Sequence, residues 1–284
     1  MLGKLIKYDL KSMNRFLIIL HAFLLLIAVL LRVFVTSRIQ LQTDEGSLLF
    51  AFAILAYVLA ITGIAFGTAI VIAVRFYKNL FSDEGYLTWT LPVTPGTHLL
   101  AKTISGSIWS FIDNVLVFAA LYIGIATPDF LRLFESQKEE LMTELGFVGK
   151  YADITAGQLL AIFLLMGLLS CICNVVIYYA SIVLGQLFPS HRVVGAVACY
   201  FAITTLGSVA SFLFTGIAQL SSGNLNFRFI VNFGAEGAAG TGMSLTFVEY
   251  ISQVLVISLG ASLLFSAVLY IISYQLMKKK IDLN

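Results

Sequence analysis

Long apolar runs alternate with shorter polar segments along the whole chain. Crossing the hydrocarbon core of a bilayer takes about 20 predominantly apolar residues in a helix. Strands of a membrane barrel alternate apolar and polar residues, whereas these runs are continuously apolar, so helices satisfy their backbone groups within lipid. The pattern predicts an all-α integral membrane protein with six transmembrane helices. The predicted spans lie near residues 16–36, 48–74, 97–126, 155–187, 192–218 and 246–276.

The composition is that of a single transmembrane domain over residues 1–284. Of these residues, 60% are hydrophobic and 11% are charged, and the charged fraction is about half that of soluble domains. The longest polar interruptions are 127–154 and 219–245. The first has apolar residues at helical spacing among acids over 128–150, which predicts an amphipathic helix on the outer surface. The second alternates with period two and then becomes Gly-rich, so both a strand-like hairpin and a re-entrant element fit it.

Basic residues are distributed unevenly among the segments that separate the spans. If both termini face the cytoplasm, most of the 17 lysine and arginine residues lie in cytoplasmic segments, and the outer segments contain most of the acids. The positive-inside rule favours this orientation. We therefore expect cytoplasmic termini, a cytoplasmic loop over 75–96, and extracellular loops over 127–154 and 219–245.

The first fifteen residues have an amphipathic pattern ahead of the first span. On a helical wheel, apolar residues share one face and four basic residues lie opposite them. This pattern predicts an interfacial helix over 1–15, with anionic lipid of the membrane as one partner for its basic face and another protein as the alternative. The four basic residues are Lys4, Lys7, Lys11 and Arg15.

Asp9 interrupts the apolar face of this predicted helix. A partly buried carboxylate needs a partner, and three bases of the cytoplasmic segments are candidates, together with backbone amides of the loop 75–96. We expect Asp9, with Lys7 and Lys11, to brace that loop at the membrane interface. The candidate bases are Arg75, Lys78 and Lys102.

The loop 75–96 has the sequence RFYKNLFSDEGYLTWTLPVTPG and contains several signals of ordered structure. Its first part predicts a short amphipathic helix that ends at Gly85, because glycine favours the C-terminal cap position. The aromatic residues Tyr86 and Trp89 suit a membrane interface. Thr94 followed by proline is typical of an N-cap, so the third span should begin at residue 95. Exposed apolar groups of such a loop need a cover, either the membrane surface or another protein.

The basic N-terminal segment, the six spans and the loop sequence FYKNLFSDEGYLTWTLPVTP resemble the permease subunits of type-2 ATP-binding-cassette (ABC) exporters of Gram-positive bacteria. The resemblance covers the whole chain in layout and is concentrated in 1–15 and 75–102. It implies a multi-pass protein of the bacterial cell membrane that pairs with a second permease copy, as a homodimer or heterodimer. It also implies a re-entrant element at 219–245 and export of a drug, an antimicrobial peptide, a lipid, polysaccharide or a similar amphipathic substrate.

In that family the loop between the second and third spans forms a coupling helix that docks on a separate ATPase subunit, which binds ATP and Mg²⁺. The resemblance therefore implies a docking helix over 75–84, with apolar residues in a groove of the ATPase and Glu84 against a basic group at its edge. The docking residues that it implies are Phe76, Tyr77, Leu80, Phe81, Ser82, Asp83 and Glu84.

The sequence lacks the motifs of several enzyme classes. No phosphate-binding loop G-x-x-x-x-G-K-[ST] occurs, so ATPase activity is expected on the partner and no cofactor on this chain. The motifs H-E-x-x-H and G-x-S-x-G are also absent, and His21, His98 and His191 lie in different segments without a recognisable nucleophile. We expect neither an enzyme nor a metal site, and no nucleic-acid partner.

Asp113 is an acid near the middle of the third predicted span. Such a residue costs about 2.5–3.5 kcal/mol on insertion scales, so it should face the bundle or a wet cavity. With Asn114 beside it and Asn174 in the fourth span, it forms either a packing node or part of a transport path. The alternative function is a secondary transporter or channel with Asp113 as the coupling carboxylate. A membrane-embedded scaffold or enzyme that recruits an unrelated protein is a third hypothesis.

Two glycines in the second predicted span have the spacing of a helix-packing motif. Small residues let helix backbones approach closely, so Gly63 and Gly67 predict a close helix contact. That contact lies either within the chain or at the seam between two copies.

Overall fold

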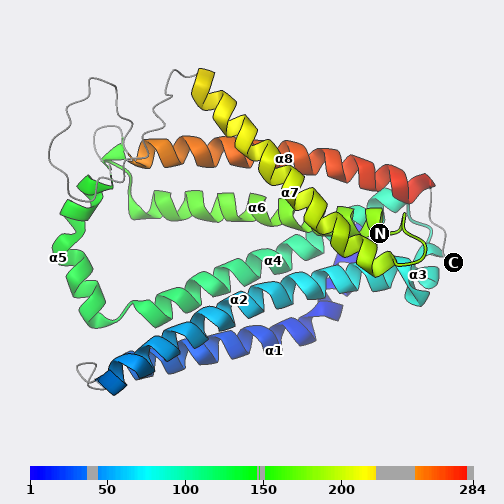
Figure 1. Ribbon diagram of the computed structural model, residues 1–284. Helices are drawn as coiled ribbons and strands as arrows, with labels where there is room; N and C mark the ends of the chain where they lie inside the picture. The colour runs from blue at the N-terminus through cyan, green and yellow to red at the C-terminus, as the bar shows by residue number, and fades with distance from the viewer. Residues whose placement is uncertain (37–43, 146, 148–150, 222–246, 280–284) are drawn as a thin grey trace.

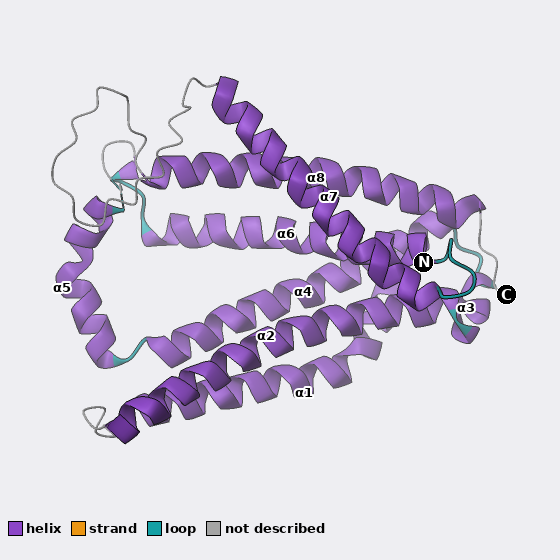
Figure 2. Cartoon of the chain, viewed as in Figure 1, coloured by secondary structure: helices purple, strands orange, loops and turns teal. Residues whose placement is uncertain are grey.

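A computed structural model of the chain describes residues 1–36, 44–145, 147, 151–221 and 247–279. In this part of the chain the regular elements are helices (Figure 2). Six of them, α1, α2, α4, α6, α7 and α8, are long and apolar enough to cross a membrane, which confirms the all-α class and the prediction of six long apolar helices. The helices are α1 (Leu2–Thr36), α2 (Asp44–Phe81), α3 (Asp83–Trp89), α4 (Pro95–Ile125), α5 (Pro128–Glu144), α6 (Ala156–Gly185), α7 (Arg192–Ser221) and α8 (Phe247–Lys279).

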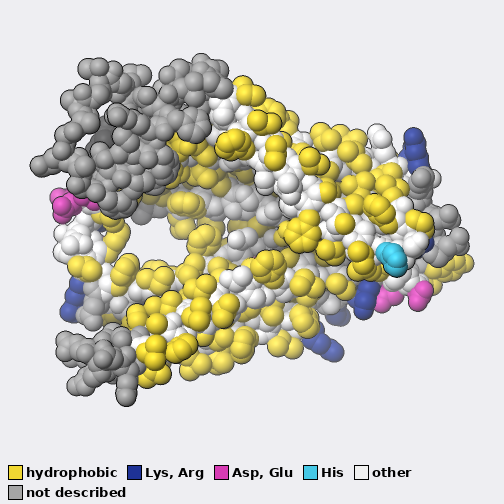
Figure 3. All heavy atoms as spheres, in the orientation of Figure 1, with side chains coloured by type: hydrophobic (Ala, Val, Ile, Leu, Met, Phe, Trp, Pro, Cys, Tyr) yellow, Lys and Arg dark blue, Asp and Glu magenta, His cyan; other side chains and the backbone are white. Residues whose placement is uncertain are grey.

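The long helices form two groups of three (Figure 1). Helices α1, α2 and α4 pack together, as do α6, α7 and α8, and contacts of α6 with α2 and α4 join the groups. The groups converge near α3 and the N-terminus, which we call the α3 end, and separate towards α5, which we call the α5 end. Figure 3 shows an opening between them near the α5 end, bordered on both sides by hydrophobic side chains.

The first helix is longer than predicted, since α1 runs without interruption for 35 residues. Residues 2–15 are its first turns and not a separate interfacial helix. The reason is that the buried positions of both parts form one stripe at spacings of three and four residues, which a continuous helix presents on one face. The basic residues remain exposed on the opposite face. The buried stripe consists of Asp9, Met13, Leu17, His21, Leu24, Ala28 and Leu31.

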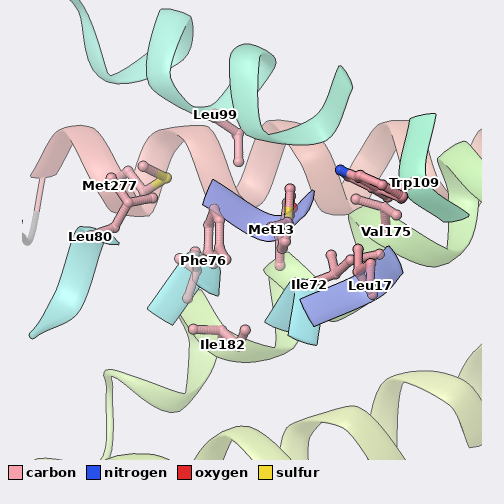
Figure 4. Close-up of a cluster of buried hydrophobic side chains, with 12 residues drawn as sticks. Met13, Leu17, Ile72, Phe76, Leu80, Leu99, Trp109, Val175, Ile182 and Met277 are labelled. Atoms are coloured by element: carbon pink, nitrogen blue, oxygen red, sulfur yellow. The ribbon is translucent and has the colours of Figure 1, made fainter. Parts of the chain in front are cut away.

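The second helix also extends beyond its predicted end, and its last turns belong to the core at the α3 end (Figure 4). Side chains from five helices meet there. The ring of Phe76 stacks on that of Tyr179, with ring centroids 3.9 Å apart and planes inclined by 10°. The buried members of this cluster are Met13, Leu17, Ile72, Phe76, Leu80, Leu99, Trp109, Val175, Tyr179, Ile182, Val183 and Met277.

Two helix starts are capped by threonine side chains, the first of them as predicted. Helix α4 begins at Pro95, and the Thr94 hydroxyl accepts a hydrogen bond from the backbone N–H of Thr97 at 3.4 Å. At the start of α6, Thr155 and Gln158 form a reciprocal capping box, with N···O distances of 3.3 and 2.9 Å. Both arrangements satisfy amides that have no partner within the helix.

Helix α5 occupies most of the predicted amphipathic segment 128–150. It links the two groups at the α5 end, and most of its side chains are exposed. The last residues of that prediction, 148–150, lie outside the described residues. So does the predicted hairpin or re-entrant element at 219–245, apart from residues 219–221, which belong to α7.

Of the two glycines that predict a close helix contact, only Gly67 makes one within the chain. A Cβ atom added at Gly67 would lie 3.2 Å from the Leu20 side chain, whereas one at Gly63 would meet nothing within 4 Å. A closer approach occurs at Gly106, where an added Cβ would lie 2.6 Å from the hydroxyl oxygen of Tyr179. Gly106 thus lets α4 approach α6, and the contact of Gly63 with a second copy stays a prediction.

Candidate functional site

The carboxylate of Asp9 is buried between α1 and α4 and is fully engaged there. The Nζ of Lys102 donates to its Oδ1, and the hydroxyl of Ser105 donates to its Oδ2. Asp9 and Lys102 are only 6% and 8% exposed. The expected pairing of Asp9 with a base of the loop region is therefore present, and Lys102 is the base. Because each charge has a partner, neither is left unpaired in the interior.

Asn79 extends this pair to α3. Its amide oxygen accepts from Lys102 Nζ at 2.6 Å, and its amide nitrogen donates to Glu84 Oε2 at 3.1 Å. The amide orientation is assigned from these partners, because an ammonium group only donates and a carboxylate only accepts. Asp9, Asn79, Glu84, Lys102 and Ser105 thus connect α1, α2, α3 and α4, and we call them the polar network.

The second group of helices also contacts this network. The hydroxyl of Tyr179, in α6, donates to the backbone oxygen of Lys102 at 3.1 Å. Tyr179 is 2% exposed, so its hydroxyl needs such an acceptor. The residue at position 102 is therefore held through its side chain by α1 and α2 and through its backbone by α6.

Helix α3 folds back against the end of α2. The indole nitrogen of Trp89 donates to the backbone oxygen of Leu80 at 3.0 Å. A Cβ atom added at Gly85 would lie 2.7 Å from the same oxygen, so only glycine permits this approach. Gly85 lies inside α3 and is not the C-terminal cap of a 75–84 helix, which corrects the prediction. The helix boundary instead falls at Ser82, the N-cap residue of α3.

The structure corrects the position of the predicted docking residues. Phe76 and Leu80 are 1% and 0% exposed and belong to the core, while Tyr77 and Phe81 are half-buried against it. The apolar face predicted to meet a partner is covered by the chain itself, because α2 continues to Phe81 and packs against α6. Periodicity located the apolar face but not what covers it.

Other side chains are presented at the α3 end instead. Tyr86 and Leu87 are 67% and 70% exposed, and Leu91 is also exposed. Asp83 and Glu84 lie exposed in the first turn of the same helix. We call these five residues the α3 surface. The sequence pointed to Tyr86 as an interfacial aromatic residue, and the structure adds Leu87 to the same exposed surface.

Lys7 and Lys11 do not take part in the brace around Asp9. Both are exposed on the face of α1 opposite the buried stripe. A second link between α1 and α2 comes from Arg75, whose Nε donates to the hydroxyl of Ser12 at 2.9 Å. The side-chain contacts of Asp9 therefore come from α4 and not from its own helix.

A second buried polar cluster lies further along the same three helices. His21 Nε2 is 2.8 Å from Asp113 Oδ1, and the Thr68 hydroxyl donates to the same oxygen at 3.1 Å. Sequence reasoning placed Asp113 correctly inside the bundle but missed His21. The available signal was the position of His21, which falls on the α1 stripe that contains Asp9.

The two asparagines predicted to accompany Asp113 lie elsewhere. Asn114 is exposed on the next face of α4, where its amide donates to the backbone oxygen of Ser110 at 3.1 Å and contacts Cys171 Sγ at 3.0 Å. Asn174 is exposed on α6. The structure therefore does not bring the three polar residues together into one node.

Within the described part of the chain, no group of three or more His, Cys, Asp or Glu residues is arranged to hold a metal ion. Comparisons with protein-family models, with curated proteins and with solved structures find no match. The functional interpretation therefore rests on the residues and contacts of this chain.

Proposed function

We propose that this chain is the permease subunit of an ABC exporter of the bacterial cell membrane, and that its α3 surface docks on a separate ATPase subunit. One observation carries the proposal: a short helix with exposed apolar and acidic side chains stands at one end of a six-helix membrane bundle and is tied into it by the polar network. A second permease copy completes the pathway. The substrate is a drug, an antimicrobial peptide, a lipid or a similar amphipathic molecule.

The α3 surface has the composition of a docking site. Tyr86 and Leu87 expose most of their side chains side by side, and large apolar residues in such a position mark interaction surfaces. Buried in a pocket of the partner, they would be the energetic centre of the interface, because interface energy concentrates in a few large anchors. Asp83 and Glu84 would meet basic groups at the rim and guide association.

The polar network connects movement of the α3 surface to the long helices of the bundle. Movement of α3 displaces Glu84, which is bonded to Asn79 of α2. Asn79 is bonded in turn to Lys102 of α4, and Lys102 is bonded to Asp9 of α1, so the movement acts on all three helices. Because Tyr179 of α6 is bonded to the backbone of Lys102, the same movement acts on the second helix group. A rigid shift at the α3 end would change the separation of the groups at the α5 end, as in hinged domain motions.

The test is co-expression with phosphate-loop ATPase subunits encoded beside the gene. Leu87→Asp should lose co-purification of the ATPase, because loss of a hot-spot residue costs at least about 2 kcal/mol, roughly a 30-fold weakening. The matched control is Leu133→Asp on α5, at the opposite end, where Leu133 is 56% exposed.

Equal recovery of the ATPase with both variants would contradict the docking proposal. Size-exclusion profiles of both variants show whether the permease is still folded. Transport assays in membrane vesicles add a second comparison. Export that continues without ATP would favour the alternative function, a secondary transporter.

A further inference from the structure

Both ring nitrogens of His21 face oxygen atoms. Nδ1 is 2.6 Å from the backbone oxygen of Leu17, and Nε2 is 2.8 Å from Oδ1 of Asp113. A carbonyl oxygen only accepts, so Nδ1 carries a hydrogen. The contact between Nε2 and the carboxyl group then also needs one hydrogen, because two lone pairs at hydrogen-bond distance repel each other.

We propose that His21 and Asp113 form a binding site for one proton inside the bundle, held between Nε2 and Oδ1. The proton resides either on the ring, giving an imidazolium beside a carboxylate, or on the carboxyl group, giving two neutral partners. The pair has no net charge in either arrangement. Release of the proton to water leaves a neutral ring, a carboxylate and a net charge of one negative unit.

The surroundings of the site favour the occupied state. The side chains of His21 and Asp113 are only 5% and 10% exposed, and an isolated buried charge is strongly disfavoured. Within the described part of the chain, no lysine or arginine forms an ion pair with Asp113 to replace the proton. The hydroxyl of Thr68, from α2, donates to Oδ1 and supports this position of the carboxyl group.

The remaining neighbours come from α4 and α6. Trp109 of α4 stacks on the imidazole ring, with ring centroids 6.4 Å apart and planes inclined by 21°. Cys171 and Tyr178 of α6 lie within electrostatic range of Asp113 and are neutral near pH 7 in their ordinary states. None of these groups supplies a positive charge to the carboxylate.

The proton therefore stabilises the contact between α1 and α4, and we call this proton-dependent contact the latch. With it in place, α1 is bonded to α4 through His21 and Asp113, and α2 joins at the same oxygen through Thr68. Without it, the ring and the carboxylate repel each other and α1 loses this contact. Proton occupancy thus sets how firmly α1 is held within its group of three helices, independently of any ATPase partner.

The experiment uses the full chain, labelled with ¹⁵N-histidine, in lipid nanodiscs at about pH 8, above the ordinary pKa of a histidine side chain. His21→Gln assigns the His21 signals, and Asp113→Asn assigns the infrared band of the Asp113 carboxyl group. We expect either an imidazolium signal from His21 or a protonated carboxyl band from Asp113. A neutral His21 together with an ionised Asp113 at that pH would overturn the proposal.

Hydrogen exchange tests the latch on the same samples. Asp113→Asn should increase amide exchange in α1 around residue 21, whereas the control Asn114→Ala changes an exposed neighbour and should leave it unchanged. Equal exchange in wild type and both variants would refute the latch. If a variant fails to fold, the wild-type spectra still test the proposal, because neutral signals from all three histidines together with the absence of any protonated carboxyl band would overturn it.

Discussion

Replacing Lys102 by methionine is the sharpest test of the polar network. The substitution keeps an unbranched apolar side chain of similar length but removes the ammonium group that donates to Asp9 and Asn79. The carboxylate of Asp9, only 6% exposed, would then retain Ser105 but no positive charge. It must take up a proton or stay charged in the interior, and both outcomes destabilise the fold.

The expected loss is large because the pair is buried. Breaking a buried ion pair by removing one partner typically costs about 3–5 kcal/mol, whereas replacing both partners by apolar residues is often close to neutral. Lys102→Met should therefore lower the free energy of unfolding by about 3–5 kcal/mol. The double variant Asp9→Leu/Lys102→Met should recover most of that loss, since it leaves no unpaired charge.

The free energy of unfolding is measured by denaturant titration in mixed micelles for wild type, both single variants and the double variant. A matched control is Lys138→Met, which removes the ion pair of Lys138 with Glu135 at 3.8 Å on the exposed face of α5. Exposed pairs contribute about 0–1 kcal/mol, so the control should change little. If Lys102→Met costs no more than the control, or if the single losses simply add in the double variant, the reasoning is refuted.

Two further predictions concern the junction of α2 and α3. Gly85→Ala should destabilise the protein by about 1–3 kcal/mol, because the added methyl group would lie 2.7 Å from the backbone oxygen of Leu80. Gly63→Ala serves as the control in thermal unfolding, because a methyl group added at Gly63 meets no atom within 4 Å. Equal unfolding midpoints for the two variants would contradict the close approach of Gly85 to Leu80. Trp89→Phe removes the indole hydrogen bond to Leu80, so amide exchange in α3 should rise about fivefold, corresponding to about 1 kcal/mol. Unchanged exchange would show that this bond does not hold α3.

The features that could be predicted from the sequence depend on neighbouring residues. An apolar run long enough to span a bilayer forms a helix wherever it lies, because the backbone has no other partner in lipid. The start of α4 followed in the same way from Thr94 and Pro95, since capping acts over three or four positions. Helix α5 followed from its spacing of apolar residues.

The features that the sequence could not supply depend on contacts between distant residues. Asp9 clearly needed a partner, but only the packing of α1 on α4 selects Lys102, which lies 93 positions away. His21 and Asp113, 92 positions apart, meet for the same reason.

By itself, the sequence determined an all-helical chain with six long apolar helices and an amphipathic helical segment after the second predicted span. Only the tertiary structure decided that Phe76 and Leu80 face the core and that Tyr86 and Leu87 face outward. The physical reason is that periodicity identifies which residues share a face, whereas the neighbouring helix determines whether that face is covered.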